Sequence, residues 1–335
     1  MYIDEMQKRH YIYIIGITVV SWLLTGCSSD DSDAQRPAVG EKSEICFNAD
    51  VWRMKENTRV ATIDGNPALQ TKDIRIDAYH SGTDEDYISG AQLLYDGGAW
   101  KFWDSTNDVQ KHYYWPFDGS QSASGATAST LDFVGTCPYV QPGYVSSVAY
   151  DGSAVSVSCD MSSYMTSASQ SSVSEYLVGL AANHTLATQT AEGGAVPISL
   201  KHPFAMVKFA IATASGTTVK INSVSIGGLA TSATCGYDGT DVTWSSLSGN
   251  AAITAAEELQ VGGALTETTP LLVIPSNYGT KTLTVNATWT DWSDVTKDIS
   301  TDLSFNWQPG YIYTYTLTVT KYALKVDTSK FTEQW

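Results

Sequence analysis

The most restrictive feature of the sequence is an alternation of apolar and polar residues with a period of two. It is clearest near the C-terminus, where the stretch GYIYTYTLTVT places Tyr, Leu or Val at every second position and mostly Thr between them. Successive side chains of a β-strand point to opposite faces of a sheet, whereas a helix repeats about every 3.6 residues. The stretch therefore predicts a strand that shares one face among Tyr311, Tyr313, Tyr315, Leu317 and Val319.

Similar patterns recur along most of the chain. In 217–228 the alternation changes phase near Asn222 and Ser223, as a β-bulge does. Only 174–183 and 252–260 suggest helices, of one or two turns each. Many short strands separated by turn residues predict antiparallel β-sandwiches. The remaining strand candidates are 45–52, 73–79, 97–103, 112–117, 131–140, 204–213, 270–275 and 282–289.

A break in the pattern at 190–197, which contains Gly-Gly and a Pro, marks the expected domain boundary. We expect one sandwich over 44–193 and a second over 194–335. A signal peptide at 1–27 and a disordered acidic linker at 28–43 precede them. The exported part, about 300 residues, is long enough for two domains of ordinary size.

The N-terminal stretch has the layout of a secretory signal. A short basic patch at 8–10, diluted by Asp4 and Glu5, precedes an almost wholly apolar run at 11–24. A run of about fourteen residues is too short to span a bilayer, which needs about 20, but it suits a signal-peptide core. It closes with the letters LTGC, which resemble a bacterial lipobox, so Cys27 is the expected site of lipidation.

The acidic run that follows Cys27, at 28–33, resembles the export tag of some Bacteroidales surface lipoproteins. The alternative is a solvated linker. Export would place the protein at the outer membrane or the cell surface.

Charge and composition narrow the functional class. The net charge is −16, from 35 acidic and 19 basic residues, which argues against binding nucleic acid or, by charge, an anionic membrane. The 19 Tyr and 10 Trp beside few charged residues fit strands with half-buried faces.

Four cysteines lie beyond Cys27, namely Cys46, Cys137, Cys159 and Cys235. Export permits disulfides, but four cysteines allow three pairings and the spacing selects none of them. None forms a C-x-x-C pair, so a zinc site is not expected.

No catalytic motif is present. The histidines at 80, 112, 184 and 202 lie in separate segments, and there is no H-E-x-x-H, no G-x-S-x-G and no phosphate-binding glycine loop. The acidic stretch 84–86 lacks the alternation of an EF-hand, so we interpret it as a solvated loop. We therefore expect no catalytic residue, no metal site and no cofactor.

Several motifs in order resemble one family. An alternating strand ending in ENTRVAT follows the lipobox and the acidic tail, and DIRIDAY, YYWPF, LKHPFAMVKFAI and LLVIP come next. The chain ends with WQPGYIYTYTLTV and a tail that closes on Trp335. Together these are similar to the fimbrillin family of Bacteroidales, the subunits of type V pili. Each motif is degenerate, and the similarity covers nearly the whole chain.

The resemblance implies two transthyretin-like β-sandwich domains. It also implies a lipoprotein precursor that a trypsin-like surface protease cuts after an arginine between the first two strands. The matching bond here joins Arg59 and Val60. Cleavage there would remove the first strand, whose expected inward side chains are Ile45, Phe47, Ala49 and Val51.

Loss of that strand would open an apolar groove and a sheet edge that templates pairing with another chain. Strand addition from a neighbour would fill the groove, and a head-to-tail contact of this kind builds a filament because it does not close. A bridge from Cys46 to the body would tether the removed strand, so we expect none.

The candidate donor is the tail 322–335. Its alternation fails between Asp327 and Lys330, which leaves the register open, and the alternative is that the tail is the last strand of its own sandwich. Its expected anchors are Leu324, Val326, Phe331 and Trp335.

The predicted function is therefore that of a structural pilin in a surface fimbria that serves adhesion. Its expected partners are other pilin subunits, a trypsin-like protease and a host glycan or protein. The alternative is a lipoprotein that stays anchored through Cys27 and binds glycan, or a tip or anchor subunit. The aromatic clusters 100–103 and 113–115 could form a sugar-stacking surface, although core and strand-pair positions are commoner roles. A mature N-terminus at Val60 would favour the pilin.

Overall fold

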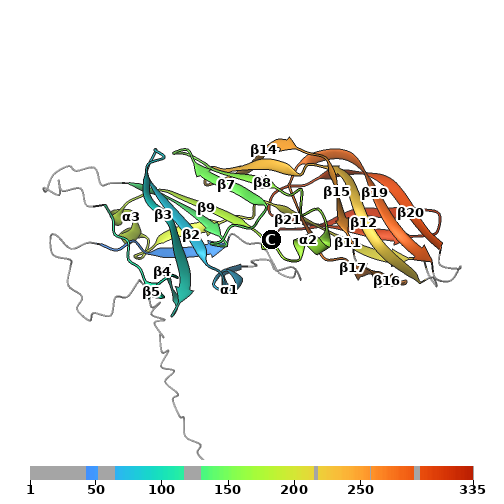
Figure 1. Ribbon diagram of the computed structural model, residues 1–335, viewed down its shortest axis with the longest axis horizontal. Helices are drawn as coiled ribbons and strands as arrows, with labels where there is room; N and C mark the ends of the chain where they lie inside the picture. Colours follow the sequence, from blue (N-terminus) through green and yellow to red (C-terminus); the bar gives the residue numbers. More distant parts are fainter. Residues whose placement is uncertain are drawn as a thin grey trace, which may run out of the picture.

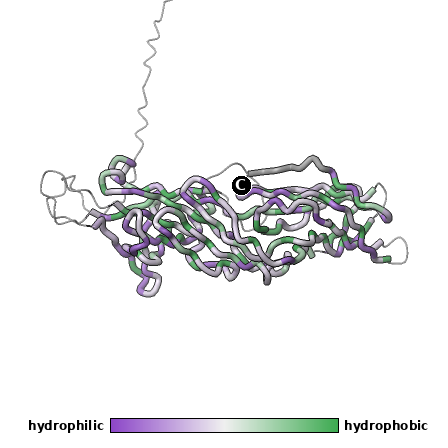
Figure 2. The backbone as a smooth tube through the Cα atoms, turned by 90° about the horizontal axis from the view of Figure 1, so that it is seen from above, coloured by the Kyte–Doolittle hydropathy of each residue, from purple (hydrophilic) through white to green (hydrophobic). Residues whose placement is uncertain are grey.

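The computed structural model describes residues 43–51, 65–116, 130–214, 218–256, 258–289 and 295–334. The molecule is elongated, as two perpendicular views show (Figures 1 and 2). It is built almost wholly of β-strands (Figure 1). The all-β class predicted from the two-residue alternation is confirmed. Within the described ranges, no helix has the length and apolar character needed to cross a membrane.

The N-terminal half contains a six-stranded sheet and a two-stranded one. Strands β1 (Phe47–Val51) and β10 (Val196–Leu200) run parallel as the two-stranded sheet, against the inner face of the larger one. The six strands, in spatial order, are β5 (Val109–Gln110), β4 (Ala99–Asp104), β3 (Asp86–Asp96), β2 (Ile74–His80), β6 (Leu131–Cys137) and β9 (Leu177–His184).

The middle of the molecule is a four-stranded sheet that draws on both halves of the chain. Its strand β8 comes from the first half and pairs with β13 from the second half. The domain division at 193/194 remains a prediction. The middle sheet contains strands from both sides of it, and β10, which follows the division in the chain, packs in the N-terminal core. In order, the four strands are β14 (Val242–Ser248), β13 (Ser232–Tyr237), β8 (Val155–Asp160) and β7 (Val145–Tyr150).

The C-terminal half is a sandwich of two sheets (Figure 1). The first contains β15 (Ala251–Ala255), β12 (Val219–Leu229), β19 (Asn277–Trp289) and β20 (Val295–Asn306), with β16 (Leu259–Val261) beside β12. The second contains β17 (Thr266–Glu267), β11 (Ala205–Thr213), β21 (Tyr311–Val319) and β22 (Leu324–Gln334), with β18 (Leu271–Val273) beside β11. Most pairings are antiparallel as predicted, but β11 runs parallel to β21, which the long stretch of chain between them allows.

The core between these two sheets follows the predicted alternation. Tyr313, Tyr315, Leu317 and Val319 of β21 are buried in it, and Tyr311 packs against it. The predicted bulge in β12 is confirmed, because its pairing with β19 shifts between Ile221 and Ser223. The same core takes the alternating side chains of β19, namely Leu283, Val285, Ala287 and Trp289.

Strand β18 explains why its sequence is apolar without alternation. Leu271 and Val273 face the C-terminal core, whereas Leu272 and Ile274 face a second core beneath the middle sheet. A strand covered on both faces is apolar at every position.

Both helix predictions were wrong. Residues 174–183 lie largely in β9, where Leu177 and Val178 are buried on opposite faces, so an apolar run without alternation resembled a helix. Residues 252–260 lie in β15 and β16, which both pair with β12. The helices that are present in the described residues are short: α1 (Gly65–Leu69), α2 (Ser167–Gln170) and α3 (Leu186–Ala191).

A buried carboxylate ties three strands of the N-terminal half together. Asp132 on β6 accepts hydrogen bonds from Ser81 Oγ at 2.7 Å and from the Gly82 N–H at 3.1 Å in the turn after β2. It also accepts from Tyr150 Oη on β7 at 2.8 Å and from the Asn183 N–H on β9 at 2.6 Å. Burial raises the pKa of Asp132, but these four hydrogen bonds outweigh it and hold the pKa below its ordinary value.

We expect Asp132→Asn to destabilise the protein by about 1.5–3 kcal/mol, because it removes the charge from these hydrogen bonds. A group with a lowered folded-state pKa stabilises above its ordinary pKa, and this is lost as the pH falls through the folded-state value. Urea unfolding from pH 7 to pH 3 should therefore show a gap between the parent and Asp132→Asn that narrows with acid. The exposed Asp84→Asn is the matched control, and a pH-independent gap would contradict the assignment.

Candidate functional site

The segment 43–51 is held by backbone hydrogen bonds from two neighbours. On one side β1 pairs with β10 from Phe47 opposite Val196 to Val51 opposite Leu200. On the other side the residues just before β1 pair with the segment 113–115. The Ile45 N–H donates to the Tyr113 carbonyl at 2.8 Å, and the Trp115 N–H donates to the Ser43 carbonyl at 2.9 Å. Residues 43–51 therefore fill a slot between two neighbours.

The predicted inward face of this segment is confirmed. Along β1 the inward and outward positions alternate between buried and exposed, and the buried Ile45 precedes the strand rather than beginning it. The Phe47 ring packs edge-on against Phe102 at 5.6 Å and against Phe133 at 5.1 Å between ring centroids. The exposed fractions are 1% for Ile45, 3% for Phe47, 4% for Ala49 and 5% for Val51.

Strand β10 is fixed to the body independently of β1. A Cβ atom at Gly135 would lie 2.5 Å from Ile198 Cδ1, and one at Gly179 would lie 2.8 Å from Leu200 Cδ2. The two glycines therefore leave the space that these side chains of β10 occupy. Lys201, just after β10, exchanges backbone hydrogen bonds of 2.8 and 3.1 Å with Val178 on β9. One wall of the slot is thus anchored to β6 and β9.

The C-terminal tail lies on its own sandwich, as the alternative prediction had it. It forms β22, an edge strand antiparallel to β21. The pairing shifts between Thr314 and Thr316, opposite the residues where the alternation of the tail fails. Leu324 is buried and Val326 is partly buried.

Part of the predicted site lies outside the described residues. This applies to Cys27, Arg59, Val60 and Trp335, and to the side chain of Phe331, whose backbone pairs with Thr314.

Three cysteines of the body are buried thiols, so none of them bridges the segment that carries Cys46. Burial raises the pKa of Cys137 and of Cys159 to about 12, and it raises the pKa of Cys235 further. Thiols with such pKa values are poor nucleophiles at neutral pH.

The histidines do not gather into a site. His202 forms a buried pair with Glu175, while His112 contacts Glu44 at 2.7 Å on another part of the molecule. In the part of the chain that the structure describes, no group of three or more His, Cys, Asp or Glu side chains could hold a metal ion.

The aromatic clusters are mostly core. Trp100, Phe102 and Trp115 are buried, which leaves Trp103, Tyr113 and Tyr114 as the more exposed members. A continuous sugar-stacking surface is therefore not formed by these clusters. Sequence reasoning also missed that 113–115 serves as the backbone partner of the first strand, because such a pairing leaves no local pattern.

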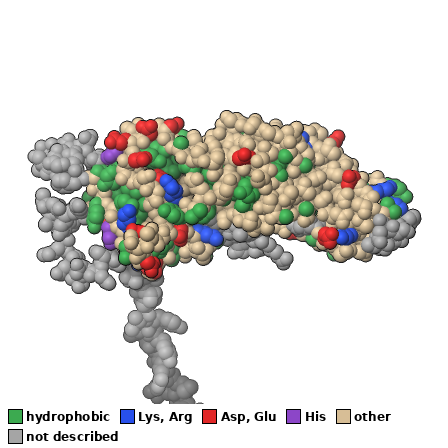
Figure 3. Space-filling model, in the orientation of Figure 1, with side chains coloured by type: hydrophobic (Ala, Val, Ile, Leu, Met, Phe, Trp, Pro, Cys, Tyr) green, Lys and Arg blue, Asp and Glu red, His purple; other side chains and the backbone are tan. Residues whose placement is uncertain are grey.

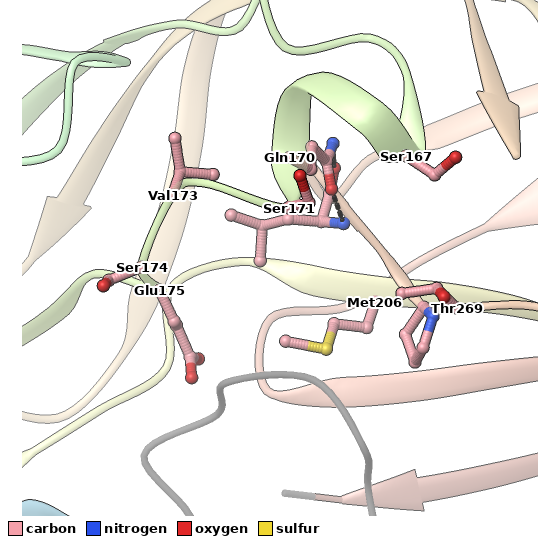
Figure 4. Close-up of a pocket in the computed structure, with 10 residues that line it drawn as sticks. Ser167, Gln170, Ser171, Val173, Ser174, Glu175, Met206 and Thr269 are labelled. Carbon is pink, nitrogen blue, oxygen red and sulfur yellow. Dashed lines mark hydrogen bonds between the residues drawn. The ribbon is translucent and has the colours of Figure 1, made fainter. Parts of the chain in front are cut away.

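One cavity of about 210 Å³ lies between α2 and β18 (Figure 4). Polar side chains that line the cavity already have partners. The Gln170 amide forms hydrogen bonds with the Leu272 backbone, and Glu175 pairs with His202. Met206 and Pro270 complete an apolar wall. We assign it no ligand.

Small polar side chains are common on the surface away from this cavity. On the face shown in Figure 3, the middle of the molecule has few charged or hydrophobic side chains. Strands β19 and β20 illustrate this composition, with Thr284 bonded to Ser300 at 2.9 Å and Thr282 bonded to Asp302 at 2.8 Å.

Comparison with known proteins identifies the family. The family model described as fimbrillin-like matches residues 58–335. The chain belongs to the fimbrillin-like family. No curated protein sequence matches it.

Solved structures similar to this fimbrillin-like protein include a candidate cell adhesion protein of Bacteroides uniformis. That one is 18% identical with a TM-score of 0.49, over 90% of this chain and 100% of the other. Another from Bacteroides ovatus is 14% identical with a TM-score of 0.49, over 88% and 98%. The C-terminally truncated tip fimbrial protein Mfa3 of Porphyromonas gingivalis is 9% identical with a TM-score of 0.42, over 87% and 100%.

Family membership supports the role of a pilus subunit in adhesion and a place in a pilus at the cell surface. The family is a structural one of the adhesin type. Assembly with other pilin subunits follows from the same membership.

Proposed function

We propose that this fimbrillin-like protein is a structural pilin that polymerises by strand exchange. A trypsin-like protease cuts after Arg59, the segment that contains β1 leaves, and a strand of the next subunit enters the slot. The observation that carries the proposal is the two-sided pairing of 43–51 between β10 and 113–115. The family match spans residues 58–335, which include the whole part of the chain that this mechanism retains.

Burying apolar side chains in the slot stabilises the subunit by enough free energy to favour assembly. Fully burying a large apolar side chain contributes roughly 1.5–3 kcal/mol. The segment supplies three such side chains, Phe47 and Val51 from β1 and Ile45 from just before it. Their sum is on the order of 5–8 kcal/mol as an upper bound. A domain has a total stability of about 5–15 kcal/mol, so an empty slot is a large loss.

The candidate donor lies at the edge of its own sheet. Among the described residues of that sheet, β22 pairs with β21 alone, and Leu324 and Val326 pack in or against the core. An edge strand that leaves breaks a single ladder and uncovers a single neighbour. This edge position favours β22 of one subunit as the strand that fills the slot of the next.

Cleavage is tested by Arg59→Ala, which should leave the precursor folded, uncut and monomeric. Arg53→Ala, in the same basic stretch, is the matched control and should be cut and assemble like the parent. Protease treatment followed by size-exclusion chromatography and electron microscopy distinguishes the two. Fibres from uncut Arg59→Ala would refute assembly by cleavage at this bond.

Lipidation at Cys27 would carry the precursor to the outer membrane before cleavage. Cys27→Ala should abolish lipid labelling and leave the protein uncleaved or in the periplasm, because the lipobox thiol is the attachment point. Metabolic labelling with a fatty acid and cell fractionation measure both effects. Normal surface delivery of Cys27→Ala would show that the lipobox interpretation is wrong.

A further inference from the structure

The side-chain amide of Gln189 holds the backbone that leads into β1. Its Oε1 accepts the Cys46 N–H at 3.1 Å, and its Nε2 donates to the Glu44 carbonyl at 3.0 Å. The same Oε1 accepts the Trp115 indole N–H at 3.1 Å. Gln189 lies on α3 and is only 6% exposed.

This amide continues the ladder of β10 past the point where β10 begins. The first backbone bond from that side runs from the Val196 N–H to the Cys46 carbonyl, at 2.7 Å. Upstream of Val196 the chain forms α3 and a turn, so it offers no extended backbone to 44–46. An amide side chain has the donor and the acceptor of a peptide group, and here it takes the place of one.

We propose that Gln189 is the docking clamp for the head of any strand that enters the slot, acting on the strand's backbone rather than its sequence. This inference rests on the proposed strand exchange. Departure of β1 takes away two partners of the Gln189 amide and leaves it bonded to Trp115. A buried amide that has lost hydrogen bonds is costly, so it favours capture of a new backbone at the same place.

The clamp recognises the backbone of the entering strand, and the aromatic pocket recognises one of its side chains. The hydrogen bonds that Gln189 makes to the strand reach backbone atoms, at Glu44 and Cys46, and so do not depend on the strand's side chains. The position that follows, Phe47, enters a pocket made by Phe102 and Phe133 and there selects an aromatic side chain. The clamp thus sets the register in which side chains meet their pockets.

The test measures how a fluorescent peptide with the sequence of residues 43–51 binds to the precursor after protease cleavage. The Kd for this peptide should rise about tenfold or more in Gln189→Ala, because two backbone hydrogen bonds are lost. Gln189→Glu keeps the acceptor for the Cys46 N–H and loses the donor to Glu44, so its Kd should lie between.

A second probe needs no change in the protein. A peptide with an ester in place of the Cys46 amide lacks the hydrogen that Gln189 accepts. It should bind the parent several-fold more weakly than the amide peptide, and this difference should shrink on Gln189→Ala. If Gln189→Ala does not fold, the parent alone still tests the proposal, because an ester peptide that binds as well as the amide peptide would overturn it.

The matched control is Gln170→Ala. Gln170 also holds a strand backbone with both ends of its amide, since the Leu272 N–H donates to Oε1 at 2.6 Å and Nε2 donates to the Leu272 carbonyl at 2.9 Å. Figure 4 shows this side chain at the wall of the cavity. Its strand, β18, stays in place during exchange, so peptide affinity should remain within about twofold of the parent.

The outcomes separate the two proposals. Equal peptide affinity in the parent and Gln189→Ala, with an ester peptide that binds as well as the amide, would overturn the clamp and leave strand exchange standing. Failure of the cut parent to bind the peptide at all would overturn both.

Discussion

A chain that begins at Val60 is expected to lose cooperative folding when it is produced alone. It lacks the four buried side chains Ile45, Phe47, Ala49 and Val51. Their absence lowers the free energy of unfolding by up to about 5–8 kcal/mol. Adding the peptide 43–51 in trans should restore a cooperative unfolding transition, followed by urea titration and circular dichroism. Its ladder partners, β10 and 113–115, remain in the chain to receive it.

The peptide with Phe47→Ala is the informative control for this rescue. Phe47 packs edge-on against two aromatic rings, and truncating a buried Phe costs about 3–5 kcal/mol. The altered peptide should therefore rescue only at concentrations several hundred-fold higher or not at all. By contrast, Asn48→Ala changes an exposed position and should rescue like the parent peptide. A Val60 chain that is monomeric and as stable as the precursor would show that β1 is dispensable.

Truncation after Val319 is expected to abolish polymerisation while leaving cleavage intact. This variant has the slot but lacks β22, the candidate donor. Removal of β22 uncovers only one edge of β21, so the body should remain folded with reduced stability. Electron microscopy and sedimentation after protease treatment measure the outcome, with the cut parent as the reference.

Mixing sharpens the truncation experiment. Truncated subunits can accept a strand but cannot donate one, so adding them to the cut parent should shorten the fibres in proportion to their share. A variant with Leu265→Ala, an exposed position just before β17 in the same sheet, should assemble normally and is the matched control. Full-length fibres from truncated protein alone would exclude the tail as donor.

Strand positions followed from the sequence wherever one face of a strand meets solvent. Strands β19 and β21 alternate cleanly, and both the buried face and the β12 bulge were predicted correctly. The pattern failed where both faces are buried, because then periodicity does not distinguish a strand from a helix. This is why β9, which packs toward two cores, was assigned to a helix.

Pairing between distant strands could not be predicted. The join of β8 to β13 and the parallel pairing of β1 with β10 connect residues far apart in the chain. The seating of β10 on β6 and β9 likewise depends on shape, because Gly135 and Gly179 make room for its side chains. A sequence contains the glycines but not the identity of the side chain that each one admits.

The candidate site was partly predictable for the same reason. The inward face of the first strand was identified from its alternation, and all four of its side chains are buried as expected. The partners on either side were not, because Gln189 and 113–115 act through amide and backbone groups. Residue type alone does not mark such roles.

The most direct test of strand exchange is the N-terminus of subunits isolated from fibres at the cell surface. Mass spectrometry of the intact subunit and N-terminal sequencing should find Val60 as the first residue, with the segment that contains β1 absent. Fibres built of subunits that begin at a lipid-modified Cys27, or that still carry residues 43–51, would contradict the mechanism.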